Sequence, residues 1–303
     1  MVWRRVLRFF GLLLSVLILA VACQDIRNGG VADVGLVRTD SVRLATLNVH
    51  YIDMRADGGR WSREGWEARK TSLDAAFKAV GADLFAFQEM ETFSGGNDDS
   101  VNLARSYLLE RNRDYAAAAM GDWRAFPSTQ PILYRRDRFV VLDQGWFFFS
   151  ETPDAIYSRT FNGSYPAFAS WARFKEIDTG AAFRVVNLHT DYASRENRRR
   201  SVALVAERVA PWIAAGETVF VAGDLNARLG SGLYEVLEAV GLTFVPVDGA
   251  TYHLDRGLNL FGAIDHIAFA GAALVGGPVV VRERFGNVWA SDHYPMFADF
   301  RLR

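Results

Sequence analysis

The sequence predicts an α/β protein in which two packed β-sheets are covered by helices. Short apolar runs rich in β-branched and aromatic residues recur from residue 42 to the C-terminus, as buried strands require. Longer segments with the helical spacing of apolar residues lie between several of those runs. Of the 303 residues, 50% are hydrophobic, which is enough to fill the core of one large layered domain.

The first part of this region alternates strands and helices. Val42–Val49 and Asp83–Gln88 are apolar runs that predict two strands. Between them, Glu64–Val80 has helical spacing and stops at Gly81, a residue type that commonly ends helices. Val101–Arg111 predicts a second helix.

The middle of the chain predicts strands joined by tight turns. Residues 135–137 (Arg-Arg-Asp) and 178–180 (Asp-Thr-Gly) are turn sequences, and each separates two apolar runs. The strands expected in this part are Ile132–Tyr134, Phe139–Leu142, Trp146–Phe149, Ala169–Phe174 and Phe183–His189.

The last part returns to alternation. Glu196–Ala214 predicts a long helix, and Tyr234–Val240 predicts a short one that ends at the following glycine. Strands are expected at Thr218–Ala222, Ile264–Ala270 and Met296–Leu302. Because polar motifs are spread over the whole of residues 42–303 and no internal repeat is evident, we expect one domain there.

Six short polar motifs close these apolar runs, and they are rich in carboxylates and carboxamides. Such side chains are hard oxygen ligands for a divalent cation and partners for a phosphate, as a metal-dependent phosphoester hydrolase needs. One such motif is a weak signal, whereas six in this order are a strong one. They are Ala45–Val49, Phe87–Glu89, Val186–His189, Gly223–Asn226, Ile264–His266 and Ser291–Pro295.

Three of these motifs point to a known family. Gly-Asp-Leu-Asn at 223–226, Ile-Asp-His at 264–266 and Ser-Asp-His at 291–293 occur in this order. The chain thereby resembles the endonuclease/exonuclease/phosphatase superfamily, which has a deoxyribonuclease-like fold. The resemblance covers residues 43–303. It implies a four-layer α/β/β/α sandwich, with two mixed β-sheets packed face to face and helices outside.

The resemblance also implies a metal site. It makes Glu89 the principal ligand, with Asn48 beside the metal and Asp292 near it. Carboxylate and carboxamide oxygens favour Mg²⁺, with Mn²⁺ and Ca²⁺ as alternatives. The chain has 5 histidines and 1 cysteine, without the His-x-His or Cys-x-x-Cys spacing expected of a zinc site.

Five residues are expected to carry the catalysis. A histidine held by a carboxylate is a general base with a fixed tautomer, and the resemblance pairs His293 with Asp265. It assigns Asp224 to orienting or activating the attacking water. It places His189 and Asn226 at the phosphate as substrate contacts. The expected reaction is in-line attack of water on phosphorus.

The N-terminus predicts an export signal. A basic start with three arginines precedes the apolar run Phe9–Ala22, which is the pattern of a secretory signal peptide. We therefore expect residues 1–22 to be a signal peptide and residues 23–41 to be a tether or linker.

Cys23 is the only cysteine of the chain, so no intrachain disulfide can form. A lone cysteine after such an apolar run resembles a bacterial lipobox, although the usual leucine three positions earlier is Ala20 here. In lipoproteins this cysteine is lipidated and anchors the protein to a membrane, on the periplasmic or extracellular face. The alternative is ordinary signal cleavage, which would give a secreted or periplasmic protein.

The expected function is that of an exported, metal-dependent phosphodiesterase, and we expect a monomer. When the three arginines of the signal are removed from the 34 Lys and Arg, 31 remain against 35 Asp and Glu, so the mature chain carries about −4. Proteins that track nucleic acid are usually basic on the binding face. This charge favours a small or lipid phosphodiester. The alternatives are a nuclease that cleaves DNA or RNA and a catalytically silent binding module on the same fold.

Overall fold

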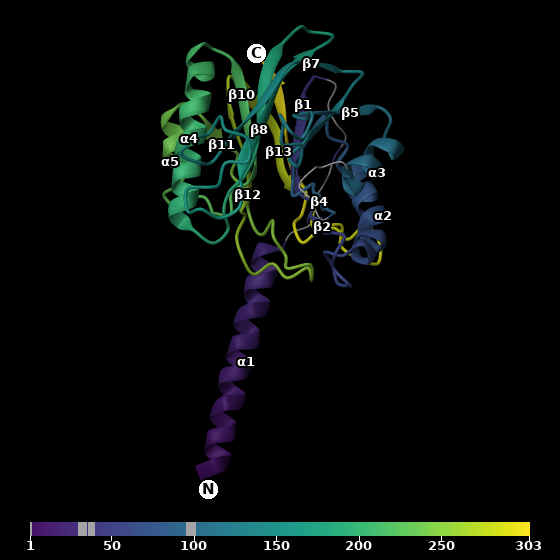
Figure 1. Cartoon of the computed structure of the whole chain (residues 1–303). Helices are drawn as coiled ribbons and strands as arrows, with labels where there is room; N and C mark the ends of the chain where they lie inside the picture. Colours follow the sequence, from purple (N-terminus) through teal and green to yellow (C-terminus); the bar gives the residue numbers. More distant parts are fainter. Residues whose placement is uncertain (1, 30–34, 36–39, 95–100) are drawn as a thin grey trace.

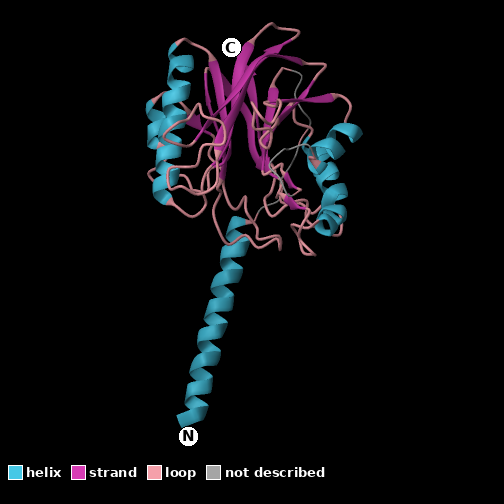
Figure 2. Cartoon of the chain, viewed as in Figure 1, coloured by secondary structure: helices cyan, strands magenta, loops and turns pink. Residues whose placement is uncertain are grey.

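The computed structural model of the chain describes residues 2–29, 35, 40–94 and 101–303. Two six-stranded sheets pack face to face, and helices cover both outer faces (Figures 1 and 2). This arrangement confirms the predicted four-layer α/β/β/α sandwich. Part of the expected tether, residues 30–34 and 36–39, lies outside the described residues.

The first sheet is built around the parallel pair β1 and β3, with antiparallel neighbours on both sides. Its strand order is β13-β14-β1-β3-β6-β5. The helices α2 (Arg63–Val80) and α3 (Leu103–Arg111) pack on its outer face. The strands are β1 (Val42–Asn48), β3 (Leu84–Gln88), β5 (Tyr115–Ala118), β6 (Ile132–Arg135), β13 (Ala272–Val280) and β14 (Met296–Leu302).

The second sheet has its own parallel pair, β9 and β10. Its strand order is β11-β12-β10-β9-β8-β7. The helices α4 (Arg195–Ala214) and α5 (Glu235–Ala239) lie on its outer face. The strands are β7 (Phe139–Phe148), β8 (Phe168–Glu176), β9 (Ala182–His189), β10 (Thr218–Asp224), β11 (Thr243–Phe244) and β12 (Asp265–Ala270).

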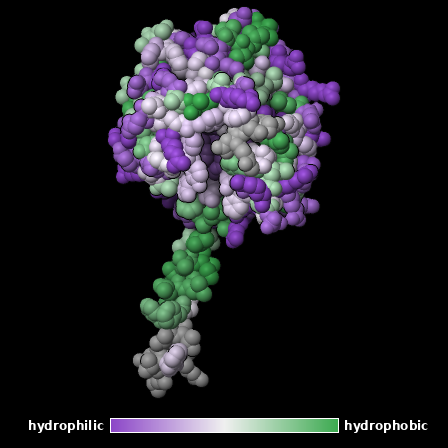
Figure 3. Space-filling view, in the orientation of Figure 1, coloured by the Kyte–Doolittle hydropathy of each residue, from purple (hydrophilic) through white to green (hydrophobic). Residues whose placement is uncertain are grey.

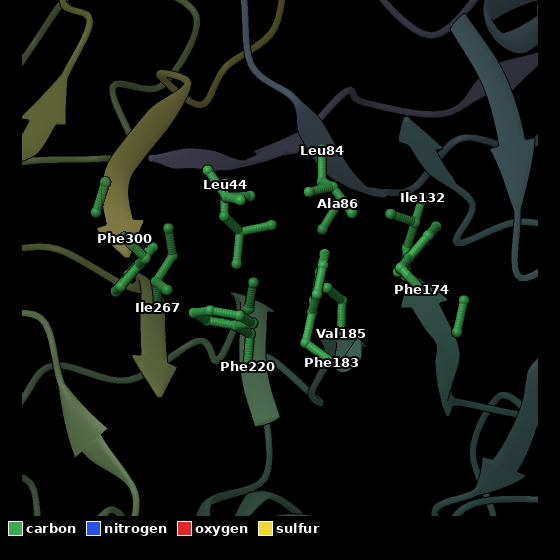
Figure 4. Close-up of a cluster of buried hydrophobic side chains, with 14 of the residues drawn as sticks. Leu44, Leu84, Ala86, Ile132, Phe174, Phe183, Val185, Phe220, Ile267 and Phe300 are labelled. Atoms are coloured by element: carbon green, nitrogen blue, oxygen red, sulfur yellow. The ribbon is translucent and has the colours of Figure 1, made fainter. Parts of the chain in front are cut away.

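The two sheets meet in an apolar core (Figure 4). Leu44 and Ile132 come from the first sheet and Phe183 and Phe220 from the second, and each is at most 1% exposed. Because alternate residues of a strand point to opposite faces, the other half of each buried strand packs under the helices. This double burial explains why the strands appear in the sequence as nearly continuous apolar runs.

The two ends of helix α2 are set by capping residues that can be recognised in the sequence. The Ser62 hydroxyl accepts a hydrogen bond from the Gly65 amide and caps the first turn. Gly81 adopts the left-handed conformation (φ 55°) that ends the last turn. The predicted end at Gly81 is therefore confirmed.

Other limits differ from the prediction. β7 is one strand from Phe139 to Phe148, where two were expected, and its register shifts between Val141 and Asp143. The polar residues Asp143 and Gln144 at this register shift are the reason that the sequence predicted two separate strands. β5 and β13 were not predicted. β13 contains Gly276-Gly277-Pro278, a typical turn sequence, and it tolerates this proline because it is an edge strand with irregular register.

The carboxyl ends of β1, β3, β9 and β10 lie at one end of the sandwich, which we call the motif edge. Each parallel pair brings two strand ends together, at Asn48 and Gln88 in one sheet and at His189 and Asp224 in the other. The short pair β2 (Ile52–Asp53) and β4 (Thr92–Phe93) follows β1 and β3 at this edge.

The N-terminal helix α1 (Val2–Asn28) projects from the sandwich as a single rod (Figures 1 and 3), and residues 9–24 of it are exposed. Its segment Phe9–Asn28 is long and apolar enough to cross a membrane by length and composition, a test that signal sequences also pass. The helix is thus consistent with the predicted signal sequence. It continues past Cys23, which is exposed.

Candidate active site

The backbone turns sharply where the strands end at the motif edge. His50, Glu89 and Asn226 all have positive φ, at 63°, 51° and 48°, a conformation that non-glycine residues seldom adopt. Gly223 lies so close to β9 that a Cβ there would be 1.9 Å from the Leu188 carbonyl oxygen. These turns redirect the chain within two residues of each strand end and leave the polar side chains grouped.

Asn48 connects the two sheets at this edge. Its amide nitrogen donates to Glu89 Oε1 (3.0 Å) and to Asp224 Oδ2 (3.3 Å). Its amide oxygen accepts a hydrogen bond from the His50 backbone (3.0 Å). One carboxamide therefore holds a carboxylate of each sheet, and the structure brings Asn48, Glu89 and Asp224 together as the sequence analysis expected.

His293 and Asp265 form a buried pair. His293 Nδ1 lies 2.9 Å from Asp265 Oδ2, and both side chains are almost fully buried. His293 Nε2 lies 3.7 Å from Asp224 Oδ2. With one ring nitrogen on Asp265, the other is directed toward Asp224, which is the arrangement that fixes a tautomer.

His189 lies on the more open side of this group. Its Nε2 is 3.6 Å from Asp224 Oδ2 and 3.9 Å from Glu89 Oε1. Its side chain is 26% exposed, against 6% for His293. A molecule that enters from solvent would therefore meet His189 before it meets His293.

Asn226 is held by backbone groups. Its amide nitrogen donates to the Thr190 carbonyl (2.9 Å), and its own backbone N–H donates to Asp224 Oδ1 (2.8 Å). Asn226 thus lies beside Asp224, and its side-chain donor is engaged within the loop in this structure.

Asp292 lies on the His50 side of the site. Asp292 Oδ1 is 3.2 Å from His50 Nδ1. The Ser291 hydroxyl donates to the Asn48 carbonyl (2.6 Å), which ties the Ser-Asp-His segment to the end of β1. A pocket of about 320 Å³ opens here and is lined by His50, Arg69, Ser291 and Asp292, among others.

The pKa values of the buried groups reflect their isolation from water. Burial, with the neighbouring Asp265, raises the pKa of Asp224 to about 6. Burial opposes charge on His293, but the carboxylates of Asp265 and Asp224 outweigh it and raise the pKa of His293 to about 10. His293 therefore keeps its proton at neutral pH unless a nearby positive charge lowers its pKa.

The charge balance of the site fits a divalent cation. Among the described residues, no lysine or arginine nitrogen lies within 4.0 Å of a side-chain oxygen of Glu89, Asp224, Asp265 or Asp292. Ligand atoms of Asp224, Asp265 and His293 lie within 4.8 Å of one another. Buried carboxylates need positive charge nearby. His293 supplies it for Asp265 and Asp224, and oxygen ligands of this type also suit Mg²⁺, Mn²⁺ or Ca²⁺.

Some residues of the site have no signature in the sequence. Tyr252 forms a backbone bridge with His293, and their rings are 5.0 Å apart. Thr251 accepts hydrogen bonds from the backbone of Ile264 and Asp265. His266 instead faces away, with Nε2 2.9 Å from the Ala227 carbonyl oxygen. His266 follows Asp265 in β12, and neighbouring residues of a strand point to opposite faces. The loop residues 251–252 follow no periodic pattern.

The four-layer sandwich with a buried Asp–His cluster at one edge is a phosphoester hydrolase fold. The sequence pattern described as Endonuclease/Exonuclease/phosphatase family matches residues 45–293, and the chain belongs to this family. Members of the family are phosphoester hydrolases, among them phosphatases, phosphodiesterases and nucleases, so the family implies a phosphoester substrate.

Solved structures share the fold. An endonuclease/exonuclease/phosphatase from Bacteroides vulgatus is 24% identical over 87% of this chain and 99% of its own, with a TM-score of 0.69. A mannosyl-6-phosphatase from Bacteroides thetaiotaomicron is 22% identical over 86% of this chain and 99% of its own, with a TM-score of 0.65. ANGEL2, a 2′,3′-cyclic phosphatase, is 15% identical over 88% of this chain and 99% of its own, with a TM-score of 0.62. No match was found among curated protein sequences.

Proposed function

We propose that this protein is an exported phosphodiesterase that requires a divalent metal. The observation that carries the proposal is the buried His293–Asp265 pair directed at Asp224, with Glu89 joined to Asp224 through Asn48. A catalytically silent binding module has no need of a base and a residue that orients it, so this arrangement favours an enzyme.

Glu89 and Asn48 would hold the metal, with Asp292 nearby and Mg²⁺ as the preferred ion. When bound, the cation would neutralise phosphate charge and help the leaving oxygen depart. The group Asp224, Asp265 and His293 offers a second set of ligand atoms. We assign that group to proton transfer, because Asp265 already accepts the His293 Nδ1 proton.

Proton transfer would depend on His293. Asp265 holds the Nδ1–H, so Nε2 is the ring nitrogen that would take a proton from a water molecule beside Asp224, once a bound cation has lowered the pKa of His293. Asp224 would orient that water through its carboxylate. In-line attack on phosphorus then needs only that the water and the phosphate be held in line, which is a matter of positioning.

His189 and Asn226 would contact the phosphate. His189 is the more exposed histidine of the site and lies within 4 Å of both Asp224 and Glu89. Asn226 would have to exchange its hydrogen bond to Thr190 for one to a phosphate oxygen. Hydrogen-bond donors held at the phosphate stabilise charge that develops in the transition state.

The substrate class follows from weaker observations. The mature chain is slightly acidic, which favours a small or lipid phosphodiester over DNA or RNA. A nuclease is the main alternative. A phosphomonoesterase is another, because one similar structure is a mannosyl-6-phosphatase.

Export rests on the N-terminal segment. The exposed apolar helix and the small residues before Cys23 support a signal peptide at residues 1–22, with the domain at 42–303. We propose lipidation of Cys23 and attachment to the membrane, with the protein acting as a monomer. Mass spectrometry of the mature N-terminus and gel filtration would test these two points.

The activity is tested by hydrolysis of bis-p-nitrophenyl phosphate, with p-nitrophenyl phosphate as the monoester comparison. The assay is run with Mg²⁺, with Mn²⁺ and with EDTA, and His293→Ala is the control. We expect metal-dependent hydrolysis of the diester that is lost in the variant. A folded protein that hydrolyses neither compound with any metal would contradict the proposal, and faster turnover of plasmid DNA would favour the nuclease.

A further inference from the structure

The N-terminal helix is fastened to the domain at its last turn. Asp25 Oδ1 accepts hydrogen bonds from the Asn259 backbone (2.6 Å) and from its side chain (3.1 Å). The Asn28 side chain donates to the carbonyls of Asn259 (2.9 Å) and Phe261 (3.2 Å). Asn28 is only 8% exposed. These contacts fix where the helix leaves the domain.

The loop that receives the helix also supports the catalytic pair. Ala250 donates its N–H to the Asn28 carbonyl (3.0 Å). The next residue, Thr251, accepts a hydrogen bond from the Asp265 backbone (3.1 Å), and Tyr252 bridges to His293. The helix α1 therefore leaves from the motif edge, and the C-terminus lies at the opposite end of the sandwich (Figure 1).

Exposed aromatic side chains gather on the same edge. Outside α1, the described aromatic residues that are most exposed are Trp61, Tyr165, Tyr192 and Phe261, at 42%, 83%, 79% and 48%. Trp61 stacks 5.2 Å from the His50 ring. Tyr192 comes three residues after His189, and Phe261 comes four before Asp265. Tyr and Trp, three of these four residues, are enriched at membrane–water interfaces.

Tyr165 belongs to the same group. It lies in the loop between β7 and β8, and the adjoining end of β8 pairs with the carboxyl end of β9 through Ala169 and Leu188. Burial and the carboxylates of Glu89 and Asp53 raise the pKa of Tyr51, and Tyr165 and Tyr192 lie near enough to contribute to that rise. The Tyr51 backbone N–H donates to Glu89. The four exposed aromatic residues thus lie on segments next to the motif edge.

We propose that the motif edge lies against the membrane that holds the N-terminal segment, so that the site acts on phosphoesters at the lipid–water surface. Before the proposed removal of residues 1–22, the segment Phe9–Asn28 is apolar and long enough by composition to cross a membrane, and its last turn is bonded to the domain through Asp25 and Asn28. A lipid on Cys23 would give the same orientation, since Cys23 lies two residues before Asp25. The orientation of the domain on the membrane does not depend on the proposed function. The inference that the substrate is a phosphoester rests on the proposed function.

The orientation is tested with matched cysteine labels on the full chain in vesicles. Phe261→Cys places a fluorophore at the motif edge, and Ile177→Cys places one after β8, at the opposite end of the sandwich. The two native side chains are matched in exposure, at 48% for Phe261 and 47% for Ile177. The unsubstituted chain gives the background from Cys23. With nitroxide-labelled lipids we expect roughly threefold stronger quenching at position 261. Equal quenching, or a soluble mature protein with unmodified Cys23, would overturn the proposal.

An activity measurement separates the orientation from the chemistry. The double variant Asp25→Ala/Asn28→Ala removes the fastening, and Asp57→Ala, an exposed loop carboxylate, is the control. We expect the double variant to hydrolyse a fluorescent phosphatidylcholine in vesicles roughly tenfold more slowly, because the site is no longer held at the surface. Its rate on bis-p-nitrophenyl phosphate should not change.

The two ways of failing are distinct. If the wild-type chain hydrolyses neither compound, the proposed function fails and the label experiment still decides the orientation. If the wild-type chain and the double variant hydrolyse both compounds equally, the proposed role of the membrane-facing orientation fails although the enzyme is active.

Discussion

At the scale of single residues, burial and neighbouring charges shift the pKa values of an acid, Asp224, and a base, His293. Burial raises the pKa of Asp224, and nearby carboxylates raise the pKa of His293. A base with so high a pKa keeps its proton at neutral pH. A cation near Glu89 would lower the pKa of His293 through charge repulsion, which makes the metal and the base interdependent.

The first prediction concerns the base and the residue that orients water. His293→Ala and Asp224→Ala should each lower kcat by about 10²–10⁴, since each removes a group that acts in the transition state. Circular dichroism should show a folded protein in both cases. Steady-state kinetics on bis-p-nitrophenyl phosphate measure the effect, and near wild-type kcat in either variant would refute the assignment.

The second prediction concerns the metal. Mg²⁺ should raise the Tm of the wild-type protein relative to EDTA, because an ion that binds only the folded state stabilises it. Glu89→Gln keeps the hydrogen bond to Asn48 feasible but removes the charge, so it should abolish this increase in Tm. Thermal unfolding with and without Mg²⁺ measures it. An unchanged increase in Glu89→Gln would mean that the metal binds elsewhere, with Asp224, Asp265 and His293 as the next candidates.

At the scale of elements, the carboxyl ends of two parallel strand pairs place the reactive groups. β9 and β10 run side by side, and the backbone at Gly223 passes close to the Leu188 carbonyl. Only a residue without a side chain fits there. The glycine of the Gly-Asp-Leu-Asn motif therefore serves the packing of two strands, and this packing sets the position of Asp224.

The third prediction follows from that close approach. Gly223→Ala should destabilise the protein by about 3 kcal/mol, because its Cβ would overlap the Leu188 carbonyl oxygen. Gly180→Ala is the control, since Gly180 also has positive φ but no atom within 4 Å of its Cβ, and it should cost about 1 kcal/mol. Urea unfolding compares the two. Equal losses would show that the strands can move apart at little cost.

At the scale of the whole molecule, the two sheets are joined by a buried polar contact just inside the site. Gln88 Nε2 donates to Asn187 Oδ1 (2.7 Å), and Asn187 Nδ2 donates to the Phe87 carbonyl (2.7 Å). Both side chains are fully buried. This contact fixes the distance between the sheet that carries Glu89 and the sheet that carries Asp224.

The fourth prediction tests this contact. Asn187→Ala should destabilise the fold by about 2 kcal/mol, because it removes the donor to the buried Phe87 carbonyl and one of the acceptors of the Gln88 amide, which keeps its contacts with Thr46 and the Ala86 carbonyl. It should also lower kcat, although Asn187 lies behind the site. Asn287→Ala, at an exposed loop position, is the control. Normal stability with normal kcat in Asn187→Ala would show that the sheets are positioned by apolar packing alone.

The sequence by itself determined the layered fold and most strand positions, because strands buried on both faces leave continuous apolar runs. It also identified the polar residues at the strand ends, which the fold gathers at one edge. It did not reveal β5 or the irregular edge strand β13, since neither has a regular apolar pattern.

Only the tertiary structure decided how these groups meet. The contact of Asn48 with both Glu89 and Asp224 joins residues up to 176 positions apart, and the loop 251–252 supports Asp265 and His293 without any motif. The attachment of Asn28 near Asn259 is likewise invisible in the sequence. Periodicity reports which face of an element is buried, whereas the partner across the interface depends on how distant segments pack.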